Sequence, residues 1–195
     1  MPCLAMHVAI AHQYCKYHVD EDIETFRFGA IVPDIDPDKF TSHYGIVGKA
    51  TSVKQSLENK TDIIKCINDL NIDNPHDRAK FLHLITDYLY YRYIYVADVE
   101  KITKEQLDQS LYNDYNYITY YVLDKYKITI PSQAQHLVRS KPCDGDFEFI
   151  TRQQVDMFID KIARLNLKQA SEQILKDKQS FLNNFMVSLG KTINI

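Results

Sequence analysis

The chain has 195 residues, of which 45% are hydrophobic and 25% are charged, a balance typical of soluble globular proteins. Its length suits a single domain, residues 1–195. The formal net charge of -3 argues against a strongly basic surface for nucleic acids. No run of about 18 apolar residues occurs, so we expect no transmembrane helix.

The cysteines and the N-terminus predict a cytoplasmic protein. The four Cys are scattered and form no CxxC pair, which favours reduced thiols over a disulfide or zinc-thiolate framework. The first 15 residues have no basic segment, and His7 and His12 interrupt their apolar stretch, so we do not expect a signal peptide.

Few turn-forming residues occur, with only 5 Gly and 6 Pro, and helices are therefore favoured over many short strands. An apolar stripe at three- and four-residue spacing predicts a helix over residues 3–18, with His7 on its inward face. A second helix is expected over residues 20–32, ended by Pro33, with Gly29 allowing another backbone to approach closely.

Residues 33–49 contain two Pro and two Gly and are predicted to form a long loop, which holds Asp34 and His43. Asn74 and Pro75 are typical of a helix start. Residues 127–146 are expected to be mostly irregular. The chain is thus predicted to be an all-α, single-domain bundle of about seven helices, the remaining ones at 51–59, 62–70, 75–96, 103–126 (one or two helices), 149–165 and 168–189.

The segment FLHLITDYLYYRY, residues 81–93, carries the most specific pattern. His83 and Asp87 are four residues apart and therefore lie on the same face of a helix, among Leu, Ile and Tyr side chains. Such a pair is either a buried hydrogen bond or part of a metal site.

Three further residues extend the possible metal site: His7, Asp34 and His43. Imidazole and carboxylate are ligands for zinc, and also for iron or manganese. The five side chains can hold one metal ion with an open position, or two ions that share a carboxylate. A water at an open position is a nucleophile for ester hydrolysis. Each signal alone also fits a core histidine or an Asp turn.

Four segments resemble, in order, the zinc-dependent phospholipase C family, which is related to the single-strand-specific zinc nucleases. They are MHVAIA around His7, GAIVPDIDP around Asp34, SHYG around His43, and FLHLITD around His83 and Asp87. The resemblance covers roughly residues 1–95.

This resemblance implies an all-α hydrolase of phosphoester bonds that acts on a small phosphoester. It implies that Asp34, His43 and His83 hold one ion, and that Asp87 bridges to a second ion held by His7. The two carboxylates, Asp34 and Asp87, are also the catalytic residues that we expect. A metal-bound water would attack phosphorus, and the metal would offset charge on the phosphate oxygens.

The chain departs from the family at its third metal site. Residues 88–95 contain no His, and His136, the only later His, has no Glu four residues further on. We therefore expect one or two ions rather than three. An alternative function is a catalytically inactive metal-binding helical module that serves as a binding protein.

Substrate contacts are predicted for Tyr44, Tyr88 and Arg92, because these residues adjoin the proposed ligands and an Arg near a metal binds phosphate well. Packing by the tyrosines and solvation of the Arg is the alternative. An EF-hand is excluded, because Lys39 and Gly45 occupy the positions that need Gly and Glu. A third and weaker possibility is a histidine/aspartate phosphohydrolase, a family whose site is built on an adjacent His-Asp dipeptide.

Overall fold

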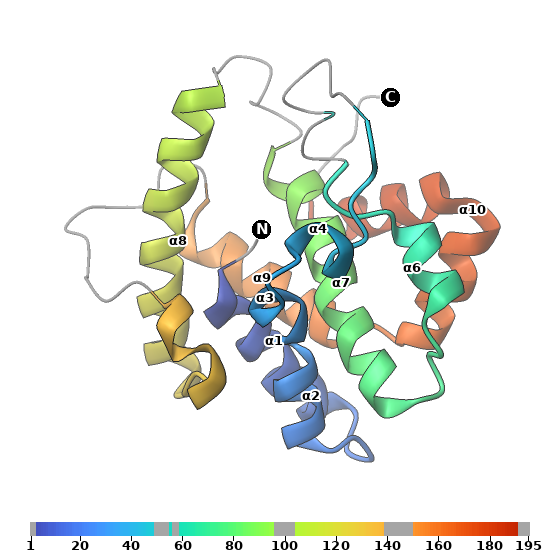
Figure 1. The fold of residues 1–195 in the computed structure, drawn as a ribbon, viewed down its shortest axis with the longest axis horizontal. Coiled ribbons are helices and arrows are strands. Elements are labelled where there is room, and N and C mark those ends of the chain that lie inside the picture. The colour runs from blue at the N-terminus through green and yellow to red at the C-terminus, as the bar shows by residue number, and fades with distance from the viewer. Residues whose placement is uncertain (1–2, 49–54, 56–58, 96–103, 139–149, 191–195) are drawn as a thin grey trace.

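The computed structural model describes residues 3–48, 55, 59–95, 104–138 and 150–190, and within these ranges it contains helices and no strand (Figure 1). The all-α prediction is confirmed. The described part holds nine α-helices rather than about seven, because two one-turn helices lie in the predicted loop. The helices are α1 (Leu4–Tyr17), α2 (Ile23–Gly29), α3 (Val32–Ile35), α4 (Lys39–Ser42), α6 (Ile63–Asp69), α7 (Pro75–Tyr95), α8 (Lys104–Tyr126), α9 (Arg152–Ala163) and α10 (Leu167–Ser188), with a 3₁₀-helix η2 (Ser132–Leu137).

Helix α1 lies inside the bundle and packs against α2, α7, α8 and α9. The sequence predicted one inward stripe, but this prediction was too narrow. Ala5, Met6, Ala9 and Ile10 are also fully buried, because neighbouring helices cover the first two turns on every side. The inward position predicted for His7 is confirmed.

Helix α7 is the second central element, in contact with α1, α2, α3, α6 and α10. Its start agrees with the prediction, since the Asn74 side chain accepts hydrogen bonds from the backbone N–H groups of His76 (2.9 Å) and Asp77 (3.3 Å). In Figure 1, α8 lies on one side of the bundle and α6 and α10 lie on the other. Helix α7 thus lies between α8 on one side and α6 and α10 on the other. His83 and Asp87 are in its buried middle.

Close packing of α2 on α7 depends on Gly29. A Cβ atom at this position would lie 2.3 Å from the Cβ of Ala79, and 3.1 Å from the Ala79 carbonyl carbon. The predicted close approach of another backbone is therefore confirmed. This close contact also places the carbonyl of Ala30 against His83, which lies one turn after Ala79 on α7.

The prediction of an irregular loop over residues 33–49 was wrong in part, since α3 and α4 lie in it. Pro33 does not end the preceding helix. It stands in the first turn of α3, where the missing N–H of proline costs nothing. Helix α4 begins where the Asp38 side chain accepts a hydrogen bond from Thr41 N–H. Both helices are only four residues long, too short for an apolar period to reveal them.

Two other predicted segments had mixed outcomes. The helix predicted at 51–59 lies outside the described residues, apart from positions 55 and 59. The helix predicted at 168–189 is present as α10, in which Ile174, Phe181 and Phe185 are buried and Leu175 is 50% exposed. The helix is kinked at Asp177, whose φ of -156° and ψ of 89° are not helical. Among the described helices, none is both long and apolar enough to cross a membrane.

Replacing Gly29 by Ala should destabilise the fold, because the new methyl group overlaps Ala79 and forces α2 away from α7. We expect the free energy of unfolding to fall by about 1–3 kcal/mol. Urea denaturation of the metal-free protein followed by circular dichroism measures this. Asn184→Ala, an exposed change in α10, is the control and should leave the midpoint unchanged. An unchanged midpoint for Gly29→Ala would contradict the close packing.

Candidate metal centre

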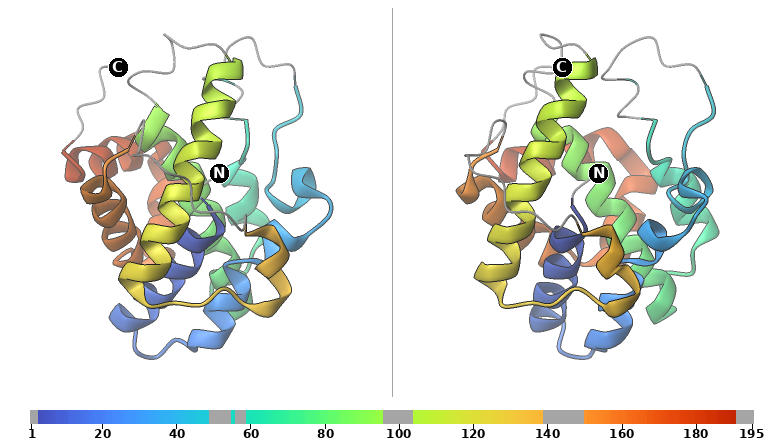
Figure 2. Two further views of the ribbon diagram at one scale, coloured as in Figure 1. Left: turned by 90° about the vertical axis from the view of Figure 1, so that its left-hand side faces the viewer. Right: turned by 60° about the vertical axis from the view of Figure 1, so that its left-hand side comes forward.

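Four helices bring together the five side chains that the sequence singled out. His7 comes from α1, Asp34 from α3, His43 from the residue that ends α4, and His83 and Asp87 from α7. All five are buried, with exposed fractions between 1% and 6%. The α3 and α4 segments lie side by side over α7 and α1 (Figure 1), and α4 lies on the outside of the bundle (Figure 2).

The donor atoms lie at distances that suit a shared metal ion. Two zinc ligands about 2.0–2.1 Å from a tetrahedral ion are roughly 3.3 Å apart. Here His7 Nε2 lies 3.2 Å from Asp87 Oδ1, while His43 Nε2 and His83 Nε2 each lie 3.5 Å from Asp87 Oδ2. His43 Nε2 is also 3.5 Å from Asp34 Oδ1 and 3.2 Å from His83 Nε2. Within each candidate group of three residues, all ligand atoms lie within 4.8 Å of one another, so the group could hold a metal ion.

Backbone carbonyls fix the orientation of two imidazoles. His83 Nδ1–H donates to the Ala30 carbonyl oxygen at 2.7 Å, and His43 Nδ1–H donates to the Lys39 carbonyl oxygen at 3.0 Å. Because a carbonyl only accepts, Nδ1 must carry a proton, and Nε2 of each ring is the nitrogen that faces the centre and could bind a metal. Metal-binding histidines typically have such a partner on the second nitrogen.

His7 and Asp87 provide a second sign that the centre suits a cation. Among the described residues, neither ring nitrogen of His7 and neither carboxylate oxygen of Asp87 has a hydrogen bond of good geometry. Both side chains are only 1% exposed. Buried polar atoms without a partner are costly, and a metal ion would satisfy several of them at once.

The pKa values of His7, His83 and Asp34 are shifted by burial and by the charges of the centre. Burial lowers the pKa of His7, and the charge of His83 lowers it further. Burial also opposes the charged form of His83, but Asp87 and Asp34 raise its pKa above the ordinary value. For Asp34, burial raises the pKa, yet the hydrogen bond with His43 and the His83 charge lower it to about 2. Between His7 and His83, the two carboxylates therefore favour the protonated form of His83.

Two groups of three residues can each hold an ion, and both include His83: His7, His83 and Asp87, and Asp34, His43 and His83. The single free lone pair of His83 can bind only one ion. The geometry therefore favours one well-supplied position, formed by Asp34, His43, His83 and Asp87 Oδ2. His7 and Asp87 Oδ1 then provide two ligands for a second ion.

The predicted substrate residues lie along the chain beside the ligands, and their role stays a prediction. The Arg92 guanidinium stacks over the ring of Tyr88 at 3.7 Å and donates to the Tyr88 carbonyl oxygen at 2.8 Å. Arg92 is about 7.5 Å beyond Asp87 along the helix axis. Tyr44 is half-buried, with the Lys80 ammonium 5.4 Å from its ring centre.

The sequence reasoning overlooked Lys39, whose ammonium lies 3.8 Å from Asp34 Oδ1. It also overlooked the role of the Ala30 and Lys39 carbonyls. Lys39 and His43 are four residues apart, a spacing that would have placed them on one face had α4 been recognised as helical.

An adjacent His-Asp pair does occur in the chain, at His76 and Asp77, but it lies at the start of α7, away from the buried ligands. His76 is exposed, and the Asp77 carboxylate accepts a hydrogen bond from Asn71 N–H at 3.0 Å. The pair therefore contributes to the helix start rather than to the metal centre. Within the part of the chain that the structure describes, His76 and Asp77 do not join the candidate metal ligands.

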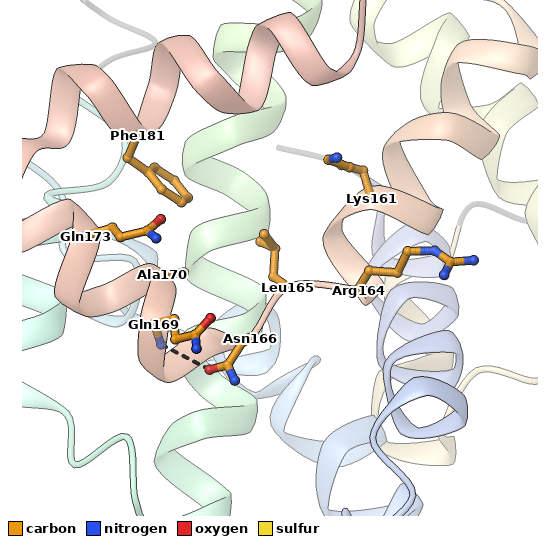
Figure 3. Close-up of a pocket in the computed structure, with 8 residues that line it drawn as sticks. All are labelled: Lys161, Arg164, Leu165, Asn166, Gln169, Ala170, Gln173 and Phe181. Carbon is orange, nitrogen blue, oxygen red and sulfur yellow. Dashed lines mark hydrogen bonds between the residues drawn. The ribbon is translucent and has the colours of Figure 1, made fainter.

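A hollow of about 210 Å³ lies elsewhere, between the end of α9 and α10 (Figure 3). Asn166 caps α10 there, accepting a hydrogen bond from Gln169 N–H at 3.0 Å. The lining has no His, Cys, Asp or Glu, so it cannot hold a transition metal. It consists of Lys161, Arg164, Leu165, Asn166, Gln169, Ala170, Gln173 and Phe181.

Zinc should stabilise the protein, and Asp87→Asn and His83→Ala should abolish this effect. At free zinc 100 times its dissociation constant, binding adds about 2.7 kcal/mol, or roughly 5–10 °C in Tm. We expect each variant to bind zinc at least about 100-fold more weakly. Thermal melts with and without zinc test this. His76→Ala, an exposed His on the same helix, is the control and should respond like the unmodified chain.

Metal affinity should fall as pH falls, because the ion must displace the proton that Asp87 and Asp34 hold on His83. The raised pKa of His83 extends this dependence above pH 6.5, the ordinary histidine value. We expect about a tenfold loss of affinity per pH unit for each proton displaced. Competition with a chelator from pH 8 to pH 6 measures the slope. A flat profile would show that His83 carries no proton to displace.

The chain matches no protein-family model, no curated protein and no solved structure. The resemblance to the zinc-dependent phospholipase C family therefore depends on the four sequence segments, and the metal centre depends on its own geometry.

Proposed function

We propose that this protein is a metal-dependent hydrolase of phosphoester bonds, with zinc, iron or manganese bound by His7, Asp34, His43, His83 and Asp87. The observation that carries the proposal is the set of donor atoms 3.2–3.5 Å apart in a buried centre. The unsatisfied atoms of His7 and Asp87 support the same conclusion. The choice of phosphoesters comes from the order of the four sequence segments.

Each ligand residue has a proposed role that follows from its position in the centre. When bound, the metal supplies a Lewis acid and an activated water. His43 and His83 are pre-oriented by backbone carbonyls, so they bind without losing further rotamer freedom. The Asp87 carboxylate offers one oxygen to each side of the centre. Asp34, with its pKa lowered to about 2, stays ionised on the outer side, where it can accept a hydrogen bond from water.

One observation favours a second function, that of a metal-binding module without catalysis. All five ligands are at most 6% exposed, and structural metal sites are typically closed in this way. In this case the metal would join α1, α3, α4 and α7, and the outer surface would carry the function.

Hydrolysis assays separate the two functions. Purified protein is loaded with zinc, manganese or magnesium and tested on bis(4-nitrophenyl) phosphate and 4-nitrophenyl phosphate. A hydrolase should release 4-nitrophenol, with turnover falling at least about 100-fold in His83→Ala. His76→Ala is the control for α7 and should keep full turnover.

Two results would contradict the proposal. Turnover that survives in His83→Ala would come from a contaminant. Tight metal binding without turnover on either ester, for every metal, would favour the binding module.

A further inference from the structure

We propose that Lys39 is an anion-binding residue of the metal centre, which pairs with Asp34 in the metal-free protein and binds a phosphate oxygen of the substrate once metal is present. The inference rests on the proposed function and assigns a substrate contact that the sequence did not predict. Its basis is the position of one ammonium group at the outer side of a buried set of ligands.

The position of Lys39 is unlike that of the ligands. Its side chain is 48% exposed, whereas the Asp34 side chain that it faces is 8% exposed. Lys39 therefore lies where the centre meets solvent, on the outer helix α4 (Figure 2). A small anion that enters from this side meets the ammonium before it meets a buried imidazole.

The contact between Lys39 and Asp34 is loose enough to exchange. Its length of 3.8 Å exceeds that of a hydrogen bond, so the three N–H donors of the ammonium are available to another acceptor. Asp34 Oδ1 is also the oxygen that lies 3.5 Å from His43 Nε2. An ion bound there neutralises the carboxylate and removes the attraction that keeps the ammonium at Asp34.

The charges in the centre lead to the same conclusion. Two carboxylates and three neutral imidazoles carry a total charge of -2, which one divalent ion cancels. The ammonium of Lys39 then leaves a local excess of +1 beside the metal, which favours the binding of an anion. Lysine binds phosphate well as a point charge. A phosphate with one oxygen on the metal would keep further oxygens that could accept hydrogen bonds from the Lys39 ammonium.

The backbone of Lys39 has a separate task that the test must preserve. Its carbonyl oxygen accepts the hydrogen bond from His43 Nδ1–H and orients that ligand. Substitution of the side chain keeps this carbonyl. Lys39→Gln therefore removes the charge while the ligand geometry is retained, and Lys39→Arg restores a cation.

The experiment uses inorganic phosphate and the manganese-loaded full chain, with manganese kept below the protein concentration so that nearly all of it is bound. Paramagnetic broadening of the ³¹P signal reports phosphate near the metal. We expect phosphate binding to weaken about tenfold in Lys39→Gln and to recover to within about threefold in Lys39→Arg. Lys65→Gln, which changes an exposed lysine on α6, is the matched control and should bind as the unmodified chain does.

Manganese affinity is measured first for each variant, and this separates the two possible failures. If the unmodified chain binds no manganese, the metal centre and the proposed function both fail. If it binds manganese but phosphate affinity is absent, or is equal in Lys39→Gln, only the role of Lys39 is overturned. Loss of manganese in Lys39→Gln would also overturn it, because the lysine would then act through the ligands.

Discussion

The buried charge of Asp87 is the constraint on which the arrangement of the helices depends. The side chain is 1% exposed, and transferring a carboxylate from water into such a place costs several kcal/mol unless a cation compensates. Its neighbours are His7, His43 and His83, which come from three different helices. Moving α1 or α4 outward would remove one of these imidazoles from the buried carboxylate. The ring nitrogens of these imidazoles face the same carboxylate. A cation bound there would compensate the charge of Asp87 and would also accept the imidazoles as ligands.

Packing and ligand orientation are linked through α2. The absence of a side chain at Gly29 lets α2 approach Ala79 on α7, and the next residue, Ala30, places its carbonyl against His83. The hydrogen bond from His83 to this carbonyl determines which nitrogen carries the proton. The close packing of α2 on α7 thus determines which nitrogen of the His83 imidazole is available to a metal.

Helical periodicity in the sequence was sufficient to place His7, His83 and Asp87 on inward faces. It was not sufficient to place Asp34 and His43 beside them, and only the resemblance to a known family suggested that convergence. One-turn helices have no repeat to detect, so α3 and α4 were predicted to be a loop, and Lys39 was not considered as a site residue.

Side chains of α7 limit the number of metal ions that the candidate centre could hold. His83 has one lone pair available, since its other nitrogen donates to Ala30, and therefore it cannot serve two ions. Further along the helix, the positions that would have to supply another ligand are occupied by tyrosines. The rings of Tyr90 and Tyr93 each lie 5.5 Å from Phe158 of α9, and both are at most 1% exposed. In this half of α7, Tyr90 and Tyr93 pack against α9, and the candidate metal ligands His83 and Asp87 lie before it along the helix. Any expansion beyond one fully bound ion must therefore proceed through the two oxygens of Asp87 and through His7.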